Sequence, residues 1–194
     1  MIVAYHCIIS AYGFWLPNDP RGSWSDWVHS WELFRAAGPA SRVSTRRSVA
    51  ADPHDARLRA AGTAALRFPP VTLTGRQALG VAMGFAEAAA AGGFAIHACA
   101  IMPQHAHVIL GRHPADIRER IGRLKRYASL QLFRRGLHPF QDYPGEKPTM
   151  WADGGWSVYL DPSDMERAIR YVENNPAKEA LRPQHWSFVT PWSG

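Results

Sequence analysis

Two histidines stand two positions apart in the stretch Met102–Leu110, where apolar residues flank them on both sides. Side chains at positions i and i+2 of a β-strand project from the same face, so His105 and His107 would present their imidazoles side by side. Neutral imidazole is a common ligand of divalent cations. A His-x-His pair can also lie on the exposed face of a strand without binding anything. The pair is therefore a candidate metal site that needs a second half elsewhere in the chain.

Tyr171 and Asn175 are candidates for that second half. They are four residues apart in a helical pattern, and side chains at i and i+4 share one face of a helix. The phenol is a candidate nucleophile towards a phosphodiester, and an amide oxygen is a hard ligand for a cation such as Mg²⁺. The alternative is that Asn175-Pro176 only ends the helix and that Tyr171 packs in the core. Residue types alone favour this alternative.

The order of the expected elements predicts the fold that would position these residues. Apolar patterning predicts strands at 2–12, 94–102, 105–112 and 156–160, and helices at 75–92, 116–135 and 164–174. A capping box at Thr74 and Gln77 marks the start of the first of these helices. The sequence thus predicts an α+β, ferredoxin-like split βαββαβ fold, with a four-stranded antiparallel sheet and helices on one face. An appended C-terminal helix carries the tyrosine.

Residues 13–70 do not fit this pattern. Gly, Pro, Asn and Asp break regular structure after the first strand, and aromatic residues lie among them. Residues 1–194 are therefore expected to form a single domain with an insertion at 13–70. Arg21, Arg42 and Arg46 in this insertion suit contacts with phosphates, although a solvated basic loop is an equally good interpretation.

The charge of the chain favours a polyanionic partner. Among 194 residues, 22 Lys and Arg against 16 Asp and Glu give a net charge of +6, and 46% of the residues are hydrophobic, as in a folded protein. Such an excess points first to nucleic acid and second to an anionic membrane surface. The helix expected at 116–135 is rich in cations, and Arg123, Lys125 and Arg126 are candidates for DNA binding. Ordinary surface charge is the default alternative.

Cysteine usage and hydropathy indicate the compartment. Cys7 and Cys99 lie in apolar runs without a paired framework, which is typical of buried thiols in a reducing environment. The start of the chain lacks the pattern of a signal peptide, and no apolar run approaches the ~20 residues of a membrane span. A cytoplasmic protein without a membrane partner is expected.

Two stretches match known motifs in the right order. Pro103–Leu110 is similar to a Pro-x-His-x-His-hydrophobic signature, and Tyr171–Lys178 is similar to a Tyr-Ile-x-x-Asn-Pro-x-Lys motif. These features resemble the HUH single-tyrosine transposases, and most closely the REP-associated tyrosine transposases. Trp186-Ser187-Phe188 resembles the Trp-x-x-Ser region that ends many of those proteins. The resemblance covers residues 71–190 and, less closely, the first strand; Ala106 departs from the bulkier apolar residue common between the histidines.

The resemblance implies an enzyme that nicks and rejoins single-stranded DNA containing stem-loops. His105, His107 and Asn175 would bind Mg²⁺ or Mn²⁺, which polarises the scissile phosphate. Tyr171 would attack that phosphate and leave a 5′-phosphotyrosine and a free 3′-OH. Rejoining is the reverse reaction and needs no external energy source. The family also suggests a homodimer, with the tyrosine acting in its own subunit or across the dimer.

Other tyrosines and other reactions stay open at this point. Tyr127, on the basic helix, is the runner-up as nucleophile, and Tyr159 also competes. A metal-dependent hydrolase that uses water as nucleophile would release product without a trapped adduct. It would normally need a carboxylate near the histidines, and Asp116, on another element, is the nearest candidate.

A non-catalytic nucleic-acid-binding module is a further alternative, because the same split βαβ fold serves in RNA recognition. Such modules stack bases on paired aromatic residues of the sheet. The expected central strands here carry His97, His105 and His107 in place of those aromatics, which disfavours this function.

Overall fold

A computed structural model describes residues 1–17, 19, 28, 30–40 and 55–194 of the chain. The chain divides into two compact units, one made of Met1–Ala11 with Thr72–Gly194 and the other of Tyr12–Val71. The second unit corresponds closely to the segment expected as an insertion. That this segment is an addition to a smaller family fold stays a prediction.

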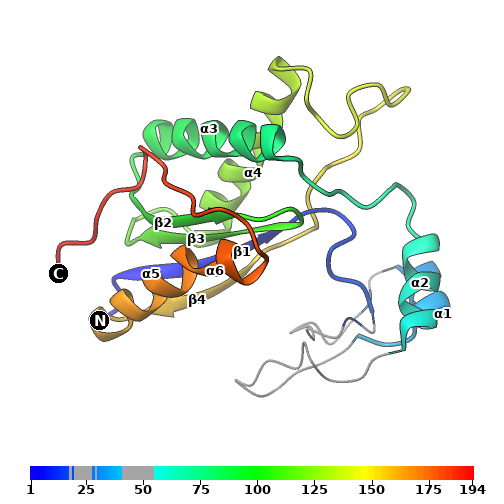
Figure 1. Cartoon of the computed structure of the whole chain (residues 1–194), viewed down its shortest axis with the longest axis horizontal. Helices are drawn as coiled ribbons and strands as arrows, with labels where there is room; N and C mark the ends of the chain where they lie inside the picture. The colour runs from blue at the N-terminus through cyan, green and yellow to red at the C-terminus, as the bar shows by residue number, and fades with distance from the viewer. Residues whose placement is uncertain (18, 20–27, 29, 41–54) are drawn as a thin grey trace. The chain divides into compact units, whose positions relative to one another are not determined.

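The first unit is built on a four-stranded antiparallel sheet (Figure 1). Its order is β2-β3-β1-β4, with β1 at Ala4–Ser10, β2 at Ile96–Ile101, β3 at His105–Gly111 and β4 at Trp156–Leu160. Helix α3 lies between β1 and β2 in the sequence, and helix α4 lies between β3 and β4. The predicted split βαββαβ fold is therefore confirmed.

Helices α3 (Gly75–Gly92) and α4 (Ile117–Arg134) pack against each other on one face of the sheet. The predicted capping box is present, since Thr74 accepts from the Gln77 backbone and the Gln77 side chain accepts from the Thr74 backbone. On α4, Arg120 is buried, donates to the Gly111 carbonyl at 2.7 Å and lies 5.6 Å from the ring centroid of Tyr5. Odd-numbered residues of β1 therefore face α3 and α4.

Gly84 lies where the backbone of α3 passes close to the backbone of α4. A Cβ there would lie 2.4 Å from the Cα of Ala128 and 2.5 Å from its backbone nitrogen. Because these are backbone atoms, we expect Gly84→Ala to lower the free energy of unfolding by about 2–3 kcal/mol in urea titrations. Gly122→Ala is the matched control, since nothing lies within 4 Å of its added Cβ and helix propensity favours Ala by up to ~1 kcal/mol. Equal stability of the two variants would contradict this packing.

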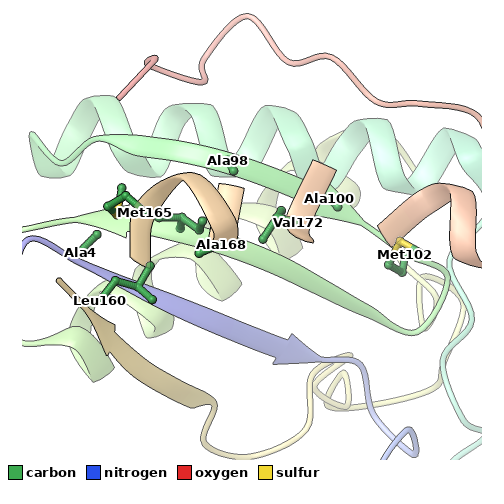
Figure 2. Packing of buried hydrophobic residues seen from close by; sticks show 9 residues of the cluster. Ala4, Ala98, Ala100, Met102, Leu160, Met165, Ala168 and Val172 are labelled. Carbon is green, nitrogen blue, oxygen red and sulfur yellow. The ribbon is translucent and has the colours of Figure 1, made fainter. Parts of the chain in front are cut away.

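The opposite face of the sheet is covered by helix α5 (Met165–Glu173), which follows β4 and the short 3-10 helix η1 (Pro162–Asp164). Figure 2 shows this core, in which α5 packs on small side chains of β2. Its buried members are Ala4, Ala98, Ala100, Met102, Ile109, Leu160, Met165, Ala168 and Val172. Strand residues alternate between faces. The even-numbered positions of β1 and the odd-numbered positions of β3 therefore face α5.

The C-terminal segment covers the outer edge of β2. The Gln184 side chain exchanges two hydrogen bonds of 2.8 Å with the backbone of Ile101, and the Thr190 backbone N–H donates to Ile96 at 2.8 Å. These bonds satisfy backbone groups that an edge strand otherwise leaves open. Among the described residues, no helix combines the length and apolar character needed to cross a membrane.

The second unit contains α1 (Trp31–Ala37) and α2 (Ala56–Ala64). Ser30 caps α1 and Asp55 caps α2 through side-chain bonds to the first-turn backbone. Helix α2 ends at Ala64, several residues before Pro69-Pro70.

Candidate active site

Three histidines form a hydrogen-bonded row on the sheet face covered by α5. Nε2 of His105 lies 3.1 Å from Nε2 of His107, and Nδ1 of His107 lies 3.0 Å from Nε2 of His6. The register places His107 opposite Ile8, so His6 is its diagonal neighbour on β1. The sequence interpretation did not single out His6. The alternating pattern of the first strand could have drawn attention to His6. However, only the register of β1 against β3 places His6 beside His105 and His107.

The separation of the two Nε2 atoms suits a shared cation. Two nitrogens that lie about 2.1 Å from one cation at angles of 90–110° are about 3.0–3.4 Å apart. Ligand imidazoles must be neutral. Burial lowers the pKa of His107, with smaller contributions from the neighbouring His105 and His6, and burial lowers the pKa of His6 to about 4. Both imidazoles are therefore neutral at neutral pH.

His6 determines which nitrogen of His107 faces the site. The rings of His6 and His107 have centroids 5.2 Å apart and planes inclined by 25°, while the nitrogens are only 3.0 Å apart. The rings thus meet nearly edge to edge, as a hydrogen bond in the ring planes requires. In the tautomer of His107 that carries its proton on Nδ1, this nitrogen donates to His6 and Nε2 keeps its lone pair for a cation.

Tyr171 reaches this row from α5. Its ring centroid is 5.6 Å from that of His107 and 5.7 Å from that of His6, with both rings meeting it edge to face. The side chain is 45% exposed. A buried core role therefore does not describe Tyr171, because the residue touches the histidines and is still open to a substrate.

The competing tyrosines lie on the other side of the sheet. Tyr127 belongs to α4, and Tyr159 pairs with Tyr5 in the register of β1 and β4. Tyr5 faces Arg120 of α4, so Tyr159 faces away from the histidines. Of the three candidate tyrosines, only Tyr171 lies beside the histidine row.

Asn175 is buried at the start of α6 (Asn175–Lys178). Its Nδ2 donates to the Tyr171 carbonyl at 2.8 Å and so secures the end of α5. This is the helix-stop role that the sequence left open, and it leaves the amide oxygen able to accept. Asn175 as a third ligand stays a prediction.

The protein supplies few side chains that could bind a cation at this site. Within the described ranges, no three His, Cys, Asp or Glu side chains cluster in a way that could hold a metal ion. Two imidazoles and one amide leave the other positions to water or substrate, as is usual for Mg²⁺ and Mn²⁺. The residues present thus fit an exchangeable divalent cation.

A comparison with known families covers the residues that include His105, His107, Tyr171 and Asn175. Residues 72–175 match the family described as "Transposase IS200 like". That stretch exceeds half of the chain and contains β2, β3, α4, α5 and the start of α6. The chain belongs to the IS200-like transposase family. Its function class is that of a transposase.

Solved structures also resemble this IS200-like transposase. One is a REP-associated tyrosine transposase bound to a REP hairpin, with 14% identity and a TM-score of 0.49, covering 100% of this chain and 87% of that chain. Another, from Deinococcus radiodurans R1, is assigned as a transposase, with 15% identity, a TM-score of 0.41 and coverage of 90% and 91%. No curated protein matches the chain significantly. The family assignment rests on the match over residues 72–175.

The basic residues predicted to bind DNA are not gathered at the histidines of this transposase. The Lys125 ammonium donates to the carbonyl oxygens of Ala152, at 2.8 Å, and Gly154, so it braces the loop before β4. Arg123 lies 3.7 Å from Glu119 in an ion pair, and Arg126 is exposed. All three predicted residues lie on α4, which covers the other face. Their DNA contacts stay predictions.

The remaining predicted residues of the transposase can be placed only in part. Arg21, Arg42 and Arg46 lie outside the described residues. Asp116, the carboxylate considered for a hydrolase, caps α4 by accepting from the Arg118 backbone at 2.8 Å. That role, at the start of a helix on the other face, disfavours Asp116 as a base for the histidine site.

Proposed function

We propose that this transposase nicks and rejoins single-stranded DNA through a covalent bond between Tyr171 and a 5′-phosphate. The observation that carries the proposal is the position of the half-exposed Tyr171 ring, 5.6 Å from His107 and 5.7 Å from His6 between centroids. A nucleophile and a candidate cation site thus lie within reach of one phosphate.

The proposed cleavage exchanges one phosphoester for another. The phenolic oxygen of Tyr171 bonds to phosphorus and loses its proton, the bond from phosphorus to the 3′ oxygen breaks, and that oxygen leaves as a 3′-OH. In rejoining, a 3′-OH attacks the phosphotyrosine and Tyr171 is released. A phenolate is a better leaving group than an alkoxide, which keeps the adduct reversible.

In this proposal the histidines act on the scissile phosphate by binding a cation that contacts it. His105 and His107, with Asn175 as a predicted third ligand, would hold Mg²⁺ or Mn²⁺, which when bound polarises the scissile phosphate. His6 is a positioning residue in this proposal. It holds the ring of His107 so that Nε2 faces His105, at 3.1 Å.

The proposed substrate is single-stranded DNA with a stem-loop. The motif resemblance and the net charge of +6 support a DNA partner. Since Tyr171 contacts histidines of its own chain, we propose cleavage within one subunit. A homodimer is compatible with this arrangement but is not needed to complete the site.

Incubation with stem-loop DNA from beside the gene tests the proposal. With Mg²⁺ or Mn²⁺, a 3′-labelled strand is expected to migrate with the protein on a denaturing gel. The 5′-labelled fragment should end in an extendable 3′-OH, and EDTA should abolish both products. Cleavage without an adduct would instead support a hydrolase that uses water. Binding without cleavage would support a non-catalytic module.

A further inference from the structure

A lysine ammonium lies over the ring of the proposed nucleophile. Nζ of Lys178, on α6, lies 3.9 Å from the centroid of the Tyr171 ring. The centroid of the same ring lies 5.6 Å from that of His107. No carboxylate in the described part of the chain forms an ion pair with Lys178. The sequence interpretation assigned Lys178 no role.

Once a cation binds to the histidines, the positive charge of the Lys178 ammonium repels it and weakens its binding. Like charges near one another repel at a protein surface, and among the described residues no carboxylate is paired with Lys178 to offset the repulsion. An anion placed between the two cations would turn the repulsion into two attractions. The scissile phosphate in the proposed reaction is such an anion, and it must lie next to the Tyr171 hydroxyl.

We propose that Lys178 is a catalytic residue that binds a non-bridging oxygen of the scissile phosphate. The inference rests on the proposed function and extends it to a residue outside the histidine pair and Tyr171. As the Tyr171 oxygen bonds to phosphorus and the bond to the 3′ oxygen breaks, negative charge on the phosphate oxygens rises. The ammonium stabilises that charge and keeps its own proton throughout.

The same geometry couples DNA binding to cation binding. Without DNA, Lys178 opposes a divalent cation at His105 and His107. With a phosphate in place, both cations are attracted to it, so each ligand strengthens binding of the other. A residue that merely held α6 in place would not affect the two steps in opposite directions.

Lys178→Met separates these effects in the full-length protein. Mn²⁺ binding without DNA, followed by electron paramagnetic resonance, is expected to tighten about threefold when the positive charge is removed. The single-turnover rate of adduct formation on the stem-loop DNA, with Mn²⁺ and DNA saturating, is expected to fall about 100-fold. Lys178→Arg keeps the charge and should restore part of the rate. Arg118→Met, an equal loss of charge at an exposed site on α4, should change neither quantity.

The outcomes distinguish this inference from the proposed function. A wild-type adduct with an unchanged rate in Lys178→Met would overturn the role of Lys178 alone. Weaker Mn²⁺ binding in Lys178→Met would equally overturn it, because the ammonium would then support the cation site. A wild-type protein that forms no adduct would overturn the proposed function and this inference together. Unchanged thermal unfolding of Lys178→Met shows that the effects are not those of misfolding.

Discussion

Replacement of Tyr171 by Phe is expected to abolish the covalent protein–DNA adduct and to slow strand cleavage by about 1,000-fold or more. The substitution removes only the phenolic oxygen, which is the proposed nucleophile. The ring remains to pack against His6 and His107 and beneath the Lys178 ammonium. DNA affinity, measured by fluorescence anisotropy, should therefore stay within about twofold, because the phosphate contacts that dominate affinity are kept.

Two other tyrosines provide matched controls for this variant. Tyr127 and Tyr159 lie on the sheet face away from the histidines. Tyr127→Phe and Tyr159→Phe should form the adduct at the wild-type rate on the same denaturing gel. Loss of the adduct in Tyr127→Phe, together with its persistence in Tyr171→Phe, would move the nucleophile to α4 and would refute the proposed site.

Replacement of His107 by Ala is expected to weaken Mn²⁺ binding about 100-fold and to reduce adduct formation by a similar factor. His107 lies between His105 and His6 and contacts both. The substitution therefore removes one predicted ligand of the cation and leaves His105 without its partner imidazole. Isothermal titration with Mn²⁺ and the single-turnover adduct assay measure the two losses.

The Mn²⁺ affinities of two further variants provide comparisons for His107→Ala. His6→Gln keeps a polar group near His107 but disturbs the ring orientation, so Mn²⁺ affinity should fall about tenfold. His185→Ala, at an exposed position of the C-terminal segment, should bind Mn²⁺ as the wild type does. Thermal unfolding of His107→Ala checks that the buried position tolerates the substitution. Metal-dependent cleavage at the wild-type rate in a folded His107→Ala protein would exclude the histidine pair as the cation site.

Local signals in the sequence were sufficient to predict the four strands and the three longer helices of the first unit, but not the short helices η1 and α6. The Thr74–Gln77 capping box and the alternation around His105 depend only on neighbouring residues. Their order also predicted the sheet, because short connections and the split βαββαβ pattern leave few topologies. His105 and His107 were predicted to share a strand face, and the structure confirms this.

Lys125 shows where residue type alone was ambiguous. On the sequence it was one cation among many on a basic helix and a candidate for DNA contact. In the structure its ammonium donates to the carbonyls of Ala152 and Gly154. Arg120, on the same helix, is buried against Tyr5. Which cations face solvent depends on how α4 packs, and that packing is set by residues distant in the sequence.

The sequence by itself determined the strand carrying the histidine pair, the helix carrying Tyr171 and the family motifs that connect them. Only the tertiary structure decided that the two meet, because docking of α5 depends on the shape of the sheet face beneath it. Ala4, Ala98 and Ala100 have small side chains that let α5 approach that face. The register of β1 against β3 then adds His6, and α6 adds Lys178. The contacts of His107 with His6 and with Tyr171 join residues more than 60 positions apart, and no local pattern encodes them.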